Sequence, residues 1–296
     1  MTHETDDTIS NNTTYAITAS YNDLVKSTRS LKFLYANARS IVKPGKLDEL
    51  NCIIQGNISS PIHVIILSET WIKSNSEAEK ISLPNYSHYY NIRENSRGGG
   101  VSIFIHDCLK HNYLEDLCKE DNHYLWVHLN KYSLDIGAVY KTPKSNDNGF
   151  FEEYSQQLMK RKRALVFGDF NYDLLNLNRT VKNYTKMLQE NGYIILNKID
   201  NKFNTRETLT KKSILDHVSS NLKHHKFHMT IVESPMSDHK QIYFEVGKYT
   251  VEPKKKIKYH TIDYTALYQT VESTVRNISD RDYNSLEYMI KEAVNR

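Results

Sequence analysis

Short runs of apolar, β-branched and aromatic residues recur through the middle of the chain, each bounded by polar, Gly or Pro turns. Runs of this length and composition are typical of buried β-strands. The runs that predict strands are LKFLYAN, IHVIILSE, GVSIFIHD, YLWVHLN, LDIGAVY, ALVFGDF, SILDHVSS, HMTIVES and QIYFEV. The pattern therefore predicts a core rich in β-sheet.

Three segments between these runs space their apolar residues three and four positions apart, which is the period of an amphipathic helix. They cover residues 45–57, 148–162 and 180–192, and the last ends in Asn-Gly, a common helix stop. Together with the strands, they predict an α/β fold in which helices flank the sheets.

The two ends of the chain lack this regular pattern. Residues 1–28 are polar and without periodicity, so we expect a loose N-terminal tail. Residues 249–296 begin with a basic, Pro-containing connector and continue with polar helical candidates at about 262–277 and 282–294. We interpret them as an appendage, which leaves residues 29–248 as one core domain.

Composition and charge narrow the class of protein only a little. The chain has 296 residues, of which 39% are hydrophobic, enough for one large core. A net charge of +4 suits a polyanionic partner without requiring one. The three cysteines form no CxxC pair, which argues against a disulfide framework or a zinc site and favours a reducing compartment. No apolar stretch is long enough to span a membrane, so we expect an intracellular protein with no membrane partner.

Polar side chains collect where the predicted strands end. Each one alone fits an ordinary turn, since Asp and Asn are common there. Strand ends on one edge of a layered fold can nevertheless converge from distant parts of the sequence. The residues at these ends are Asn37, Glu69, Tyr140, Asp169, Asn171, Asp238 and His239.

Seven motifs that contain these residues occur in one order over about two thirds of the chain. They are NARS, SETW, RGGGVSIFI, AVYKTP, GDFNYD, SILDHVSSN and SDHKQI. In this order they resemble the endonuclease/exonuclease/phosphatase superfamily, which includes DNase I and the abasic-site endonucleases. Within it, the chain is most similar to the apurinic-like endonuclease domain of non-LTR retrotransposons. The resemblance implies a DNase I-like four-layer α/β sandwich, with two central, mostly antiparallel sheets flanked by helices.

The same resemblance implies a metal-dependent cut of a phosphodiester at one end of the sheets. Glu69 would bind Mg²⁺, or Mn²⁺ in its place, with Asn37 and Asp238 in the same metal site, because hard cations prefer oxygen ligands. Asp169 would orient or deprotonate the attacking water. Asn171 would face the same pocket, because positions i and i+2 of an extended segment share a side.

The remaining matches concern the phosphate and the DNA. His239 would contact the scissile phosphate, with Asp216 fixing its tautomer, and Tyr140 would donate its hydroxyl to a phosphate oxygen. The residues expected to contact substrate are Thr205, Arg97, Arg206, Lys211 and Lys212. Phosphate contacts of this kind give affinity without sequence information.

One position departs from the pattern of the superfamily, and others allow more than one interpretation. Arg39 stands where many members of the superfamily have Asp or Asn, so we expect one catalytic metal. The glycines at 98–100 either bring backbone close to DNA or open the next strand with a bulge. His217 lacks the spacing of a metal face, and we expect it at the surface or in contact with DNA.

These features predict a Mg²⁺-dependent endonuclease that nicks duplex DNA to 3′-hydroxyl and 5′-phosphate ends. In a retrotransposon, such an end primes reverse transcription, so the expected partners are double-stranded DNA and the reverse transcriptase region of a parent polyprotein, in the nucleus. The alternatives are a phosphatase of the same fold acting on a small-molecule or lipid phosphoester, a catalytically inactive DNA-binding relic, and an interaction module whose appendage is the functional part. The sequence does not indicate an oligomeric state.

Overall fold

The structure is a computed structural model. It describes residues 11–17, 21–27, 30–55, 61–92, 98–222, 225–234, 236–247, 268–269 and 272–273. Its contacts divide the chain into a unit of residues 1–251 and a unit of residues 252–296. In the second unit the described residues, 268–269 and 272–273, are helical. Most of the predicted appendage lies outside the described residues.

The first unit contains a seven-stranded sheet that includes both the first and the last described strand, β1 (Asn11–Ala16) and β15 (Gln241–Val246). Its strand order is β1, β14 (Phe227–Val232), β15, β2 (Leu31–Asn37), β3 (Val64–Ser68), β5 (Val101–His106) and β4 (Tyr86–Asn91). The pairs β1–β14 and β2–β3 are parallel and the others antiparallel.

A six-stranded sheet packs against it. Its order is β10 (Ile194–Ile195), β13 (Asp216–Ser220), β9 (Ala164–Asp169), β8 (Leu134–Tyr140), β7 (Asn122–Leu129) and β6 (His111–Lys119). Only β8 and β9 are parallel in this sheet. A small hairpin, β11 (Arg206–Glu207) with β12 (Lys212–Ser213), stands apart from both sheets.

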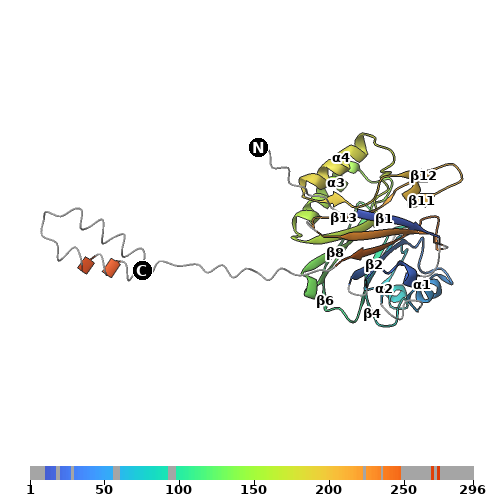
Figure 1. Cartoon of the computed structure of the whole chain (residues 1–296), viewed down its shortest axis with the longest axis horizontal. Coiled ribbons are helices and arrows are strands. Elements are labelled where there is room, and N and C mark those ends of the chain that lie inside the picture. Colours follow the sequence, from blue (N-terminus) through green and yellow to red (C-terminus); the bar gives the residue numbers. More distant parts are fainter. Residues whose placement is uncertain are drawn as a thin grey trace. The chain divides into compact units, whose positions relative to one another are not determined.

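Helices cover the outer faces of the two sheets, as Figure 1 shows. Those on the seven-stranded side are α1 (Lys46–Gln55) and α2 (Asn75–Ala78), and those on the other side are α3 (Asp147–Met159) and α4 (Arg179–Glu190). Within the described residues, the short 3₁₀ helices are η1 (Tyr21–Leu24), η2 (Asn130–Tyr132) and η3 (Asn201–Phe203). The predicted four-layer sandwich with mostly antiparallel sheets is confirmed.

The core has three hydrophobic layers because each central strand is buried on both faces. Phe33 and Phe167 stack between the two sheets with ring centroids 5.4 Å apart. Leu34, next to Phe33, belongs instead to the layer under α1, because successive side chains of a strand point to opposite faces. Trp126 and Tyr154 belong to the third layer, beneath α3 and α4. Two-sided burial explains why these strands are continuous apolar runs.

The prediction of a loose tail over residues 1–28 is wrong for β1. This strand, NNTTYA, is too polar to be recognised from hydrophobicity, but its backbone pairs with β14 from Asn11–Phe227 to Ala16–Val232. The hydroxyls of Thr14 and Thr230 also lie 2.9 Å apart across the pair. The sequence missed β4 and β6 too, and β6 is a largely exposed edge strand. Among the described residues no helix combines the length and apolar character needed to cross a membrane.

Candidate active site

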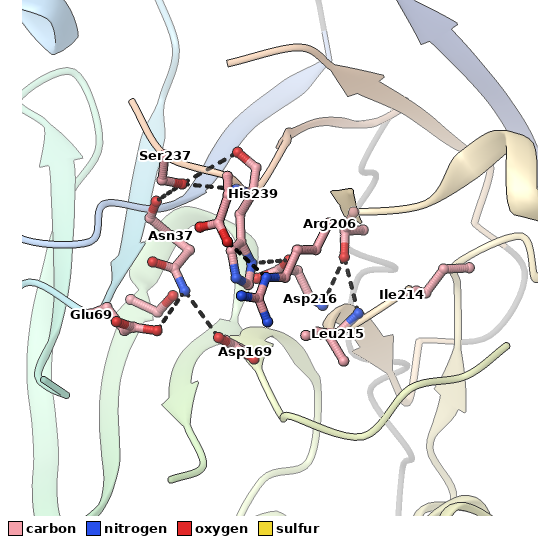
Figure 2. A network of polar contacts seen from close by, with 12 residues as sticks. Asn37, Glu69, Asp169, Arg206, Ile214, Leu215, Asp216, Ser237 and His239 are labelled. Carbon is pink, nitrogen blue, oxygen red and sulfur yellow. Dashed lines mark hydrogen bonds and ion pairs between the residues drawn. The ribbon is translucent and has the colours of Figure 1, made fainter. Parts of the chain in front are cut away.

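Four of the polar residues predicted from the strand ends, Asn37, Glu69, Asp169 and His239, lie together at one end of the two sheets (Figure 2). Asn37 ends β2 and pairs with Ser68 at the end of the parallel neighbour β3, which places Glu69 beside it. In the other sheet Asp169, at the end of β9, pairs with Asp216 at the start of β13. The two sheets thus present their polar ends to each other.

Asn37 connects the two sheets through its side-chain amide. Its Nδ2 donates to Glu69 Oε1 at 3.0 Å and to Asp169 Oδ2 at 2.9 Å. Its Oδ1 accepts the backbone N–H of Arg39 at 3.1 Å. Asn37 is buried. In this arrangement its amide nitrogen holds two carboxylates close together, which is a positioning role inside the predicted metal site.

Glu69 is presented by a strained loop that the glycine run supports. Glu69 has φ 50° and Trp71 has φ 58°, a conformation that costs energy for residues with a Cβ atom. The backbone N–H of Thr70 donates to Gly100 O, and that of Trp71 donates to Gly99 O at 3.0 Å. A Cβ on Gly100 would lie 2.5 Å from Thr70 Oγ1. The glycines at 98–100 therefore frame the Glu69 loop, with left-handed φ at all three.

Asp169 is more deeply buried than Glu69 and lies where the GDFN motif leaves the sheet. A Cβ on Gly168 would lie 2.2 Å from Val139 O, so only glycine allows this close approach of β9 to β8. Asn171 has φ 53° and donates its backbone N–H to Asp169 Oδ1 at 3.0 Å. Burial, and then the negative charge of Asp216, raise the pKa of Asp169 to about 7.

His239 and Asp216 form a buried pair beside Asp169. Nδ1 of His239 lies 2.8 Å from Asp216 Oδ2, and the hydroxyl of Tyr35 donates to Asp216 Oδ1 at 2.8 Å. Burial alone would lower the pKa of His239, but the charge and hydrogen bond of Asp216 outweigh it and raise that pKa to about 9. Nε2 of His239 has no hydrogen-bond partner in the described part of the chain, so it remains available to a ligand.

Two other predicted residues are buried in supporting positions. Thr205 is fully buried, and its Oγ1 accepts the backbone N–H groups of Leu215 at 3.0 Å and Asp216 at 3.1 Å. This geometry makes Thr205 a support for Asp216 and does not favour the expected contact with substrate. Tyr140 is 5% exposed and belongs to the core between the sheets.

The remaining predicted residues lie at the rim. Asp238 pairs with two arginines, Arg39 through Nη1 at 2.5 Å and Arg206 through Nε at 2.9 Å. Although burial favours a higher pKa, these charges and the hydrogen bond from Arg206 lower the pKa of Asp238. Lys211 and Lys212, on the β11–β12 hairpin, are exposed. Arg97 lies outside the described residues.

The group of side chains suits a hard divalent cation. One ligand atom each of Asp169, Asp216 and His239 lies within 4.8 Å of the others. The carboxylate of Glu69 joins Asp169 through the shared Asn37 amide. Burial and then the charge of Asp216 raise the pKa of Asp169, and a divalent cation would offset the repulsion between these carboxylates.

His217 corrects the expectation of a surface or DNA-contacting histidine. Its ring is fully buried and stacks on Phe170 with a 5.1 Å centroid distance. Nε2 lies 3.0 Å from Tyr172 O and 3.1 Å from Ile214 O. The alternation of side chains along β13 could have predicted this position. Because Asp216 faces the site, its neighbour His217 must face the opposite, helix-covered side.

By sequence, the chain matches no protein-family model and no curated protein. By structure, it is similar to the endonuclease domain of TRAS1, a telomere-specific non-LTR retrotransposon, with 15% identity, a TM-score of 0.55 and coverage of 73% of this chain and 98% of that one. It is also similar to the AP endonuclease LMAP from Leishmania major, with 12% identity, a TM-score of 0.56 and coverage of 76% and 90%. Humanized TDP2 from D. rerio gives 14% identity, a TM-score of 0.55 and coverage of 75% and 100%.

These similarities confirm the fold that the resemblance of the sequence motifs implied. The chain has the DNase I-like α/β fold of the endonuclease/exonuclease/phosphatase superfamily, whose nucleases and phosphatases are its structural neighbours.

Proposed function

We propose that the chain is a Mg²⁺-dependent endonuclease that nicks duplex DNA and leaves 3′-hydroxyl and 5′-phosphate ends. The observation that carries this proposal is the convergence of Asn37, Glu69, Asp169, Asp216 and His239 at one end of the paired sheets. The set provides carboxylates for a hard cation and for the attacking water, and a histidine for the phosphate. These are the groups that phosphodiester hydrolysis needs.

Each side chain has a separate task in this proposal. Glu69, with Asn37 beside it, would hold the cation, which supplies Lewis acidity toward the phosphoryl oxygen. Asp169 lies beside the Asn171 backbone and takes the proton of the attacking water. His239 donates from Nε2 to a phosphoryl oxygen, while Asp216 holds Nδ1 and so fixes the ring orientation.

The proposed substrate is supported by the charge near the site and by two structural neighbours. The β11–β12 hairpin brings Arg206, Lys211 and Lys212 to one exposed element whose first residue pairs with His239. The neighbours include the TRAS1 endonuclease domain and D. rerio TDP2 complexed with a single-strand DNA product. A retrotransposon endonuclease would act on nuclear DNA, and its 3′-hydroxyl product would prime the reverse transcriptase region of the same element.

A phosphatase is the second candidate, because the mannosyl-6-phosphatase Bt3783 of Bacteroides thetaiotaomicron shares the fold with a TM-score of 0.51 and 14% identity. Such an enzyme would act on a small phosphoester without needing the basic hairpin. Lys211 pairs with Asp173 and Lys212 with Glu207, but both lysines are exposed and able to reach a polyanion, so the hairpin favours DNA.

An assay on four substrates distinguishes the endonuclease, the phosphatase and the inactive relic. The purified chain is incubated with supercoiled plasmid, a duplex oligonucleotide containing an abasic site, a sugar phosphate and a phosphoinositide, each with Mg²⁺ and with EDTA. Conversion of supercoiled plasmid to open circles with Mg²⁺ alone supports the endonuclease. Phosphate release from the small substrates without nicking supports the phosphatase, and DNA binding without any turnover supports an inactive relic.

A further inference from the structure

The rim of the site contains a three-residue ion-pair network that the proposed chemistry does not use. Asp238 Oδ1 contacts Arg39 Nη1 at 2.5 Å, and Asp238 Oδ2 contacts Arg206 Nε at 2.9 Å. Both oxygens of one carboxylate are thus occupied by guanidinium groups, and the three residues together carry one net positive charge. Asp238 is followed directly by His239, so this charge lies next to the group proposed to contact phosphate.

Arg39 lies on a backbone turn that hydrogen bonds fix in place. It has φ 46° and is followed by Ser40 with φ 89°, two left-handed residues in succession. The turn is fixed because Ser40 N–H donates to Glu69 O at 2.8 Å and Ile41 N–H donates to Thr70 O at 3.0 Å. The loop after β3 that presents Glu69 therefore also holds the turn after β2 that presents Arg39.

Arg206 is fixed from the opposite side of the site. It begins β11 and pairs with His239 through an isolated β-bridge. In the described part of the chain, each guanidinium makes its only side-chain bond to Asp238, so most of its five N–H donors are unused. The side chains of Arg39 and Arg206 are 48% and 32% exposed, so these donors can reach a ligand in solvent.

We propose that Arg39 and Arg206 form a clamp for the DNA backbone phosphates that flank the scissile bond, and that Asp238 is the residue that positions both guanidinium groups. This inference rests on the proposed function and adds Arg39 to the substrate contacts. It also gives Asp238 a role different from the predicted metal ligand, because two guanidinium groups on one carboxylate repel a cation. Planar guanidinium groups suit this task because they bind phosphate oxygens with two parallel N–H groups.

The clamp predicts how DNA affinity depends on salt. Dissociation constants of the wild type and of Arg39→Ala, Arg206→Ala and the double variant are measured for a short duplex between low and moderate salt, with EDTA present to prevent cutting. The slope of log Kd against log salt should fall by about 0.9 for each phosphate that a variant no longer binds. Arg179→Ala is the matched control, since Arg179 is exposed on the outer helix α4, and its slope should equal that of the wild type.

Asp238→Asn tests the positioning role in the same protein. The variant should lose part of the wild-type salt slope, as the arginine variants do, and keep the wild-type Mg²⁺ concentration for half-maximal nicking. A several-fold higher Mg²⁺ requirement would make Asp238 a metal ligand and overturn its assignment here. Circular dichroism and thermal melts show whether each variant is folded.

The outcomes separate this inference from the proposed function. Unchanged slopes in Arg39→Ala and Arg206→Ala, or a wild type that does not bind duplex DNA, overturn the clamp. A wild type that binds DNA with the predicted slopes and yet never nicks it overturns the endonuclease and supports the clamp.

Discussion

Nδ1 of His239 lies 2.8 Å from Oδ2 of Asp216, although Asp216 begins β13 of the six-stranded sheet and His239 lies in the segment before β15 of the seven-stranded sheet. The same carboxylate accepts a hydrogen bond from Tyr35, so it is fixed on both oxygens. This geometry holds Nδ1 of the imidazole on Asp216, while Nε2 has no hydrogen-bond partner among the described residues. Asp216 and His239 therefore act as one unit in the proposed mechanism.

Removing either Asp216 or His239 should impair the same contact, the one between His239 Nε2 and the phosphate. Asp216→Asn keeps the shape but no longer accepts the Nδ1 proton as a carboxylate does, so it should lower the nicking rate more than DNA affinity. His239→Ala should be slower still, and the double variant should be close to His239→Ala, because catalytic groups that work together are not additive. Single-turnover nicking at saturating enzyme measures all three. A double variant slowed by the full product of the two single defects would show independent roles.

The N-terminal strand should contribute to stability. Deleting residues 1–17 removes β1 and uncovers β14, whose residues Met229 and Ile231 are buried. We expect a loss of at least ~2 kcal/mol, which lowers the Tm by about 4–8 °C for a domain of this size. A chain that begins at residue 10 is the control and should melt like the wild type. Equal melting of the two shortened chains would show that β1 adds nothing.

His217 should make the fold sensitive to acid. Its pKa is lowered to about 4 by burial, against 6.5 for an exposed histidine. Between these values the unfolded chain binds a proton that the folded chain does not, so stability is retained above pH 6.5 and falls as the pH decreases toward 4. At pH 5 the loss from this residue should be about 2 kcal/mol.

Urea unfolding at pH 7.5 and pH 5.0 measures this effect. The wild type should lose more stability between the two pH values than His217→Gln, which keeps an N–H donor for Tyr172 O and Ile214 O but cannot be protonated. The same pH-dependent loss in both proteins would assign the acid sensitivity to other groups.

The active core should end before the C-terminal segment. The last described strand, β15, ends at Val246, and none of the site residues comes from the residues that follow. A chain ending at Lys248 should therefore remain folded and keep its nicking rate within about twofold. Loss of folding in this shortened chain would place the C-terminal segment within the core.

The sequence predicted those parts of the structure that depend on local pattern. Strands buried on both faces, such as β2 and β9, are continuous apolar runs, and polar residues at their ends marked Asn37 and Asp169. The polar strand β1 was missed because backbone pairing with β14 holds it, and hydrophobicity does not report such pairing.

Contacts between segments that are distant in the sequence could not be predicted either. Nothing local in the NARS motif indicates that Arg39 pairs with Asp238, almost 200 residues later in the chain. The support of Asp216 by Tyr35 likewise depends on how the two sheets pack. Such contacts arise from tertiary geometry, whereas residue type and spacing describe only the elements.

The central claim is that the site around Glu69 cuts DNA, and Glu69→Gln tests it most directly. The substitution keeps the size of the side chain and its contact with Asn37 but removes the charge that would hold a cation. Plasmid nicking and duplex affinity are measured on the same preparation of wild type and variant. We predict Mg²⁺-dependent nicking by the wild type, a rate reduced by about 100-fold in Glu69→Gln, and the same DNA affinity measured in EDTA. Wild-type nicking by Glu69→Gln would contradict the account.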